Sequence, residues 1–197
     1  MFILVIAVVG GLVAGTLFGG SLANLERLSL RLAWMVVLAL LLQIVAFSPL
    51  GDWLPHAAVI GLHFLSYALL LACVAANIRR PPIVCFGIGV LSNAVTIVVN
   101  AGYMPASRGA LRLAGLPVST HPHNNSELAG AGAHLTFLGD IFALPHGVPL
   151  ANIFSIGDVL IAIGLAWLIA EGMRRAREDT VLPEKGPSES AIEDSGV

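Results

Sequence analysis

Five long apolar runs, separated by short polar or charged segments, dominate the chain. The runs cover residues 1–20, 32–47, 57–78, 83–100 and 150–170. A helix needs about 20 consecutive apolar residues to cross the hydrocarbon core of a bilayer. Within hydrocarbon a chain must satisfy its own backbone hydrogen bonds, which favours helices. The pattern therefore predicts an all-α polytopic membrane protein with five transmembrane helices.

The composition supports a membrane protein and excludes several soluble classes. Of the 197 residues, 57% are apolar and 11% are charged, and the mean hydropathy is +0.89. Soluble domains carry about 25% charged residues. Ten Lys and Arg residues stand against twelve Asp and Glu residues, so there is no basic surplus for binding nucleic acid. We expect the lipid bilayer, and no nucleic acid, among the partners.

Three polar segments accompany the apolar runs. Residues 21–31 place leucines at three- and four-residue intervals, which predicts a short amphipathic helix at the membrane interface. Residues 101–149 are too many for a structureless loop, so we expect a partly ordered outer segment with a short helix in residues 134–144. Residues 172–197 are polar and acidic, which is typical of a disordered tail. The sequence thus predicts one transmembrane domain, residues 1–171, followed by that tail.

The positive charges are distributed unevenly between the two sides of the predicted bundle. Lys and Arg concentrate in the cytoplasmic loops of membrane proteins. One side carries eight of the ten basic residues, and the other carries only Arg108 and Arg112 of the outer segment. Five spans with this bias place the N-terminus outside and the C-terminus in the cytoplasm. We expect a multi-pass protein of the cytoplasmic membrane.

Small residues recur at every fourth position in the first apolar run. Ala7, Gly11, Gly15 and Gly19 would share one face of a helix. Such a stripe lets another helix backbone approach closely. That helix belongs either to the same chain or to a second chain, in a homo-oligomer or a complex with a membrane protein partner.

An acidic residue lies inside the last apolar run. Asp158 stands well within its outer half. A carboxylate in hydrocarbon costs several kcal/mol or takes up a proton. An acid at this position therefore indicates either a functional site or a hydrogen bond to a neighbouring helix.

Polar residues form a stripe on each of the last two apolar runs, in their outer halves. The two helices would run antiparallel, so the stripes can face each other. They would either hydrogen-bond the helices together or form an outward-facing polar pocket around Asp158. His63, two turns into the third run, can face the same pocket. The expected pocket residues are Asn93, Thr96, Asn100, Asn152, Ser155 and His63.

All six histidines fall on the outer side of the predicted topology. His121 and His123 flank a proline and could bind Zn or Cu as a pair, and paired histidines could also hold haem. No HExxH or CxxCH motif accompanies them. We therefore expect neither a metal site nor a cofactor.

The last two apolar runs resemble the corresponding helices of bacterial lipoprotein signal peptidase. That family carries Phe-Asn-x-Ala-Asp at the outer start of its last span, where this chain has Phe-Ser-Ile-Gly-Asp ending at Asp158. Its preceding span carries Asn-x-x-Asp-Arg, where this chain has Asn-Ala-Val-Thr-Ile starting at Asn93. In that family two aspartates activate water at the outer membrane face. The resemblance implies a catalytic Asp158 and places Asn93 in the pocket.

The chain departs from that family at the first aspartate and at the arginine. Thr96 and Ile97 occupy those two positions, and threonine cannot titrate as one member of a carboxylate pair. An enzyme of this kind would need Asp140, or else Glu127, delivered from the outer segment as its second acid.

The whole chain also resembles an uncharacterised bacterial family of five-span membrane proteins, a domain of unknown function. The similar segments are residues 100–105, 138–142 and 154–161. This resemblance implies an integral protein of the bacterial cytoplasmic membrane and supplies no activity.

Three functions remain open. The leading prediction is a non-enzymatic accessory or binding subunit with an outward-facing polar pocket around Asp158. The first alternative is a membrane-embedded aspartic-type peptidase or hydrolase that uses Asp158 and Asp140 as catalytic acids. The second is a small transporter or a metal or haem carrier. The enzyme requires a second carboxylate within about 5 Å of Asp158, or one that shares a water molecule with it.

Overall fold

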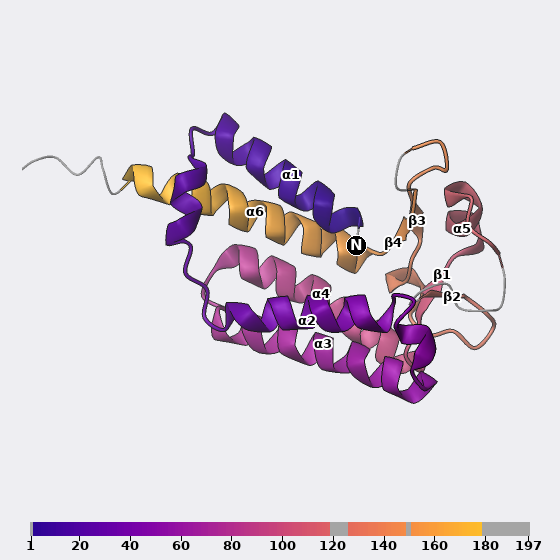
Figure 1. Ribbon diagram of the computed structural model, residues 1–197. Helices are drawn as coiled ribbons and strands as arrows, with labels where there is room; N and C mark the ends of the chain where they lie inside the picture. The colour runs from indigo at the N-terminus through magenta and orange to yellow at the C-terminus, as the bar shows by residue number, and fades with distance from the viewer. Residues whose placement is uncertain (1, 119–125, 149–150, 179–197) are drawn as a thin grey trace, which may run out of the picture.

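The computed structural model describes residues 2–118, 126–148 and 151–178, and it is mostly helical (Figure 1). Five long helices run along a common axis, and a smaller segment of strands and short helices covers one end. The long helices are α1 (Phe2–Leu17), α2 (Ala33–Ala46), α3 (His56–Ala76), α4 (Pro81–Val99) and α6 (Ile156–Glu178).

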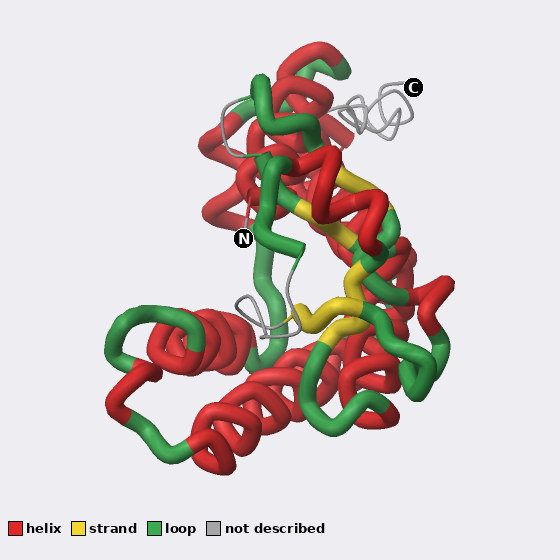
Figure 2. The backbone as a smooth tube through the Cα atoms, turned by 90° about the vertical axis from the view of Figure 1, so that its right-hand side faces the viewer, coloured by secondary structure: helices red, strands yellow, loops and turns green. Residues whose placement is uncertain are grey.

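The long helices follow one another in the order α1, α6, α4, α3, α2. Helix α6 packs between α1 and α4, and α3 packs between α4 and α2. The tight turn between α3 and α4 follows from its sequence, because Pro81 and Pro82 suit the first positions of a helix, where no backbone donor is needed. Figure 2 views the molecule from the end that carries the outer segment.

Three of the described helices are long and apolar enough to cross a membrane. They are α3, α4 and the part of α6 from Ile156 to Arg174. Helices α1 and α2 are apolar but have only 16 and 14 residues. At a rise of about 1.5 Å per residue they fall short of a hydrocarbon core about 30 Å thick. A membrane protein is thereby supported, with three candidate spans.

Glycines allow the backbones of neighbouring helices to touch. A Cβ on Gly11 would lie 2.8 Å from the carbonyl oxygen of Ala166, and one on Gly15 would press into Met173, so both glycines face α6 of the same chain. Gly19 lies beyond the end of α1, in a turn with φ +75°. The small-residue stripe therefore serves packing within the chain along Gly11 and Gly15.

The linker between α1 and α2 forms the short helix expected near the interface. It is the 3-10 helix η1 (Leu22–Arg27), capped by Ser21. Asn24 ties it to the far end of α6 by donating from Nδ2 to the carbonyl oxygen of Met173 at 2.6 Å. Helix α6 itself continues to Glu178, into the first residues of the predicted tail, and residues 179–197 lie outside the described chain.

The outer segment, together with the residues just before α6, contains β-structure that the all-α prediction lacks. Strand β1 (Met104–Ala106) pairs in parallel with β2 (Ser126–Leu128), and β3 (Phe142–Ala143) pairs antiparallel with β4 (Ile153–Phe154). Helix α5 (Arg108–Ala114) follows β1, and a 3-10 turn, η3 (Thr136–Leu138), precedes β3. A further 3-10 turn, η2 (Gly51–Trp53), joins α2 to α3.

The short helix predicted in residues 134–144 is wrong beyond the turn η3. Asp140 instead bridges to the edge of β1: its backbone N–H donates to the carbonyl oxygen of Pro105 at 2.9 Å, and its own carbonyl accepts from the N–H of Ser107 at 3.0 Å. These long-range bonds hold residue 140 extended, which a helix through it would not allow.

Candidate functional site

Asp158 belongs to a capping box at the start of α6. Its backbone N–H donates to the Ser155 hydroxyl at 3.0 Å, and its carboxylate oxygen Oδ2 accepts from the backbone N–H of Ser155 at 2.9 Å. This reciprocal pair satisfies backbone donors that a helix N-terminus leaves free. Asp158 therefore stabilises the N-terminus of its own helix, α6.

Asn93 links this capping box to α4. Its Nδ2 donates to Asp158 Oδ1 at 2.9 Å. The Ser155 hydroxyl lies 2.9 Å from Asn93 Oδ1 and 3.0 Å from Asp158 Oδ2, and its single proton serves one of them at a time. Asn93 and Ser155 are buried, whereas Asp158 is half-buried. The two predicted stripes therefore do face each other, and these three side chains form a closed polar cluster, here termed the Asp158 cluster.

The cluster depends on a close crossing of α4 and α6. A Cβ on Gly89 would lie 2.8 Å from the backbone nitrogen of Ile161 and still closer to the carbonyl oxygen of Gly157. A Cβ on Gly157 would overlap Asn93 Oδ1. Both positions admit only glycine at this separation, so the same contact that joins the helices brings Asn93 to Asp158.

Asp140 is the second acid of this region, and it is buried. Its side chain is 5% exposed, and its Oδ2 accepts from the hydroxyl of Ser126 on β2 at 2.5 Å. Burial raises the pKa of Asp140 to about 7; the bond from Ser126 opposes this rise, and the nearby charge of Asp158 adds to it. The outer segment therefore places a second carboxylate within the electrostatic reach of Asp158, and no hydrogen bond of the described residues joins the two acids.

A buried acid with a raised pKa makes the folded chain less stable as the pH rises. In the folded chain Asp140 keeps its proton up to about pH 7, whereas in the unfolded chain it loses the proton near its ordinary pKa of 3.8. Between these two pH values the folded state therefore binds more protons than the unfolded state, and the free energy of unfolding falls as the pH rises. As the pH rises from about 5 to about 8, the melting temperature of the wild-type chain should fall relative to that of Asp140→Asn. If the melting temperatures of the two chains in detergent change with pH in parallel, the pKa of Asp140 is not raised in the folded chain.

Two aromatic residues on α3 lie buried in the helix bundle. Tyr67 belongs to the buried core together with Val90 and Ile97 of α4, the helix that carries Asn93. The ring of His63 lies 5.1 Å from that of Tyr67 and 4.7 Å from that of Phe47. His63 is 2% exposed, so it is an aromatic core residue packed against Tyr67.

The remaining predicted pocket residues form their hydrogen bonds outside the cluster. Thr96 is buried, and its hydroxyl donates to the carbonyl oxygen of Ser92 in its own helix at 2.8 Å. Asn100 holds the outer segment: its Oδ1 accepts from the N–H of His134, and its Nδ2 donates to the carbonyl oxygen of the same residue, both at 2.8 Å. Asn152 Oδ1 accepts from the N–H of Ile153, next to β4.

A cavity of about 610 Å³ opens between the outer end of α4 and the outer segment. Its polar wall groups come from α4, the α4–β1 turn, α5, β2 and the loop that follows β2. They are Asn100, Tyr103, Arg108, Glu127 and His134. Of the predicted pocket residues only Asn100 lines it, so the predicted residues are divided between this cavity and the Asp158 cluster.

The cavity wall contains a phenol, Tyr103, whose pKa is affected by a nearby acid, Glu127. Burial, and to a smaller extent the charge of Glu127, raises the pKa of Tyr103 above its ordinary value. The phenol therefore stays protonated, and its oxygen lies 3.1 Å from the ring nitrogens of His56. Arg108 and His134 are exposed and Glu127 is half-buried, so the wall offers both a cation and an anion to a ligand.

Metal-binding side chains do not converge in the described part of the chain. No group of three or more His, Cys, Asp or Glu residues there is placed to hold a metal ion. Cys73 and Cys85 are free thiols. His121 and His123 lie outside the described residues.

A family model of unknown function, DUF5317, matches residues 27–170. The chain belongs to the DUF5317 family. The match takes in α2, α3, α4, the outer segment and most of α6, and with them the Asp158 cluster and the cavity. It leaves α1 outside. No curated protein and no solved structure matches the chain.

Several residues of this region escaped the sequence analysis. Tyr67 had a usable signal, because it follows His63 by one helical turn on the same face. The Ser126–Asp140 bond had none, since it depends on the pairing of β2 with β1 across a long loop. Tyr103 and its stacking on His56 likewise depend on the tertiary fold.

Proposed function

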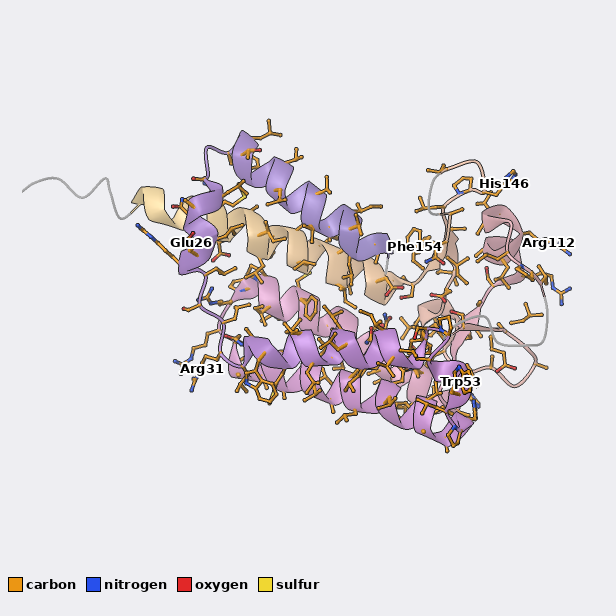
Figure 3. All side chains as sticks on the ribbon, in the orientation of Figure 1. Glu26, Arg31, Trp53, Arg112, His146 and Phe154 are labelled. Carbon is orange, nitrogen blue, oxygen red and sulfur yellow. The ribbon has the colours of Figure 1, made fainter. Side chains whose placement is uncertain are left out.

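We propose that this DUF5317 chain is a five-span protein of the cytoplasmic membrane that binds a small ligand at its outer face, without catalysis. Five spans are supported by the pairing of the short helices with long ones, α1 along α6 and α2 along α3. Local thinning of the bilayer accommodates spans shorter than its core. Figure 3 shows Arg31 at one end of the bundle and Arg112 and His146 at the other, and the bias of positive charge toward the Arg31 end favours an outer N-terminus and a cytoplasmic C-terminus.

The cavity beside Asn100 carries the binding proposal. Its volume of about 610 Å³ falls in the usual range for small-molecule sites. Arg108 and Glu127 supply opposite charges to one wall, which suits a ligand that carries an ammonium group and an acidic group. The closed Asp158 cluster supports a binding protein over an enzyme, because both carboxylate oxygens of Asp158 already accept hydrogen bonds.

Binding should be measured as a rise in melting temperature of the full chain in detergent with phosphoethanolamine or the dipeptide Ala-Ala. A ligand at 100 times its Kd stabilises by about 2.7 kcal/mol, so a specific ligand shifts melting by several degrees. Arg108→Ala and Glu127→Gln should each abolish the shift, and the exposed Arg112→Ala, outside the cavity wall, should keep it. Binding elsewhere is indicated if the shift survives in both cavity variants, and the proposal fails if neither probe shifts the wild-type protein.

A membrane-embedded hydrolase is the second candidate, and the position of Asp140 favours it. A buried acid whose pKa lies near 7, and which interacts electrostatically with a second carboxylate, has properties that suit a general acid paired with a base. In this reading Asp140 donates a proton and Asp158 activates water. Asp158 would first have to exchange one of its present donors for that water.

A further inference from the structure

Arginines gather at the end of the bundle opposite the outer segment. The described residues there include five arginines, Arg27, Arg31, Arg79, Arg80 and Arg174, against the two glutamates Glu26 and Glu171. Arg31 and Glu26 are labelled at this end in Figure 3. Arg174 is placed 5.6 Å from the centre of the Phe18 ring. The excess of positive charge lies where apolar helices leave the bilayer.

The segment that carries Arg31 is fixed to the turn between α3 and α4. Asn77, which is 7% exposed, accepts at Oδ1 from the N–H of Arg31 at 2.9 Å and donates from Nδ2 to its carbonyl oxygen at 2.8 Å. Arg80 adds a bond from Nη2 to the carbonyl oxygen of Ser29 at 3.0 Å. The backbone of Arg31 is thus held in place while its side chain stays exposed.

The Arg80 guanidinium is only partly satisfied by the protein. Its Nη1 is buried without a hydrogen-bond partner, and Nη2 bonds to a neutral carbonyl. A guanidinium carries five donors and a permanent charge, and it is best matched by carboxylate or phosphate oxygens. Arg80 is half-buried, so part of its side chain remains accessible.

We propose that Arg31 and Arg80 form a binding site for the phosphate of an anionic phospholipid headgroup. Helices α3 and α4 are long and apolar enough to cross the bilayer, so the turn that joins them lies at the depth of the headgroups. Basic pockets between membrane helices on the cytoplasmic side are suited to anionic headgroups. The clamp at Asn77 preorganises the site, because it holds the Arg31 segment against the turn that carries Arg80 before any lipid arrives.

The test compares phosphatidylglycerol with phosphatidylcholine bound to the full chain in detergent, measured by native mass spectrometry. Each arginine near an anionic surface contributes about fivefold to binding. Arg31→Gln should lower the preference for phosphatidylglycerol by about this factor, and Arg31→Gln with Arg80→Gln should lower it further. Arg31→Gln is the decisive variant, because the hydrogen bonds of residue 31 to Asn77 run through its backbone and survive the change.

The control variant is Arg112→Gln, which removes an exposed arginine from the opposite end and should leave the preference unchanged. An unchanged preference in Arg31→Gln would overturn the site. Added inorganic phosphate separates the two sources of the anion. If millimolar phosphate displaces phosphatidylglycerol completely, the site binds free phosphate and the lipid assignment is wrong.

Discussion

Gly89→Ala is expected to destabilise the helix bundle strongly, because it adds a methyl group where α4 and α6 cross. The added Cβ would lie 2.8 Å from the backbone nitrogen of Ile161 and closer still to the carbonyl oxygen of Gly157. Backbone atoms of a packed helix cannot move aside cheaply, so α4 and α6 must separate. Overpacking of this kind costs about 1–3 kcal/mol and occasionally more.

The separation has a second consequence, because the polar cluster spans the same crossing. Asn93 lies one helical turn beyond Gly89 on α4 and reaches Asp158 at 2.9 Å. A shift of the helices would stretch that bond and the contact between Asn93 and Ser155. Loss of buried hydrogen bonds would then add to the packing cost, at about 1–3 kcal/mol for each group left unsatisfied.

The matched control is Gly10→Ala, since a Cβ there meets nothing within 4 Å. Alanine in place of a glycine inside a helix is favourable by about 0.5–1 kcal/mol. Thermal unfolding of the purified chains in one detergent should therefore rank Gly10→Ala at or above the wild type and Gly89→Ala well below it. Equal melting temperatures for the two variants would mean that α4 and α6 do not cross so closely.

The helices could be predicted from the sequence because their signal is local. Each apolar run contains the information for its own helix, and the double proline after Arg80 sets the turn between α3 and α4. The meeting of Asn93 with Asp158 could also be predicted, because antiparallel neighbours with polar residues in the same halves bring those residues together. The number of membrane spans follows less directly from the sequence, because α1 and α2 are shorter than the apolar runs that contain them.

The outer segment could not be predicted in the same way. Phe137, Leu138, Ile141 and Phe142 have helical spacing, yet the bonds of Asp140 to Pro105 and Ser107 hold the chain extended. Strands of two or three residues carry no periodicity of their own, and their partners are distant in sequence. The cavity and the Ser126–Asp140 bond follow from those pairings, so they depend on tertiary structure alone.

Asp158→Leu is expected to destabilise the chain by about 3 kcal/mol or more, whereas Asp158→Asn should cost much less. Leucine removes the acceptors for the N–H of Ser155 and for Asn93 Nδ2. Loss of a cap costs about 0.5–2 kcal/mol, and each buried donor left unpaired costs about 1–3 kcal/mol. Asparagine keeps one carbonyl oxygen for the N–H of Ser155, and the Asn93 amide can turn to pair with the new amide group.

These two variants also separate the structural role of Asp158 from a catalytic one. Thermal unfolding in detergent should place Asp158→Asn near the wild type and Asp158→Leu far below it, and the binding shift at the cavity should survive in Asp158→Asn. A hydrolase would behave differently, because an amide cannot activate water as a carboxylate does. Cleavage of a labelled apolar peptide by the wild type, abolished in a folded Asp158→Asn chain, would overturn the binding function in favour of the acid pair formed by Asp158 and Asp140.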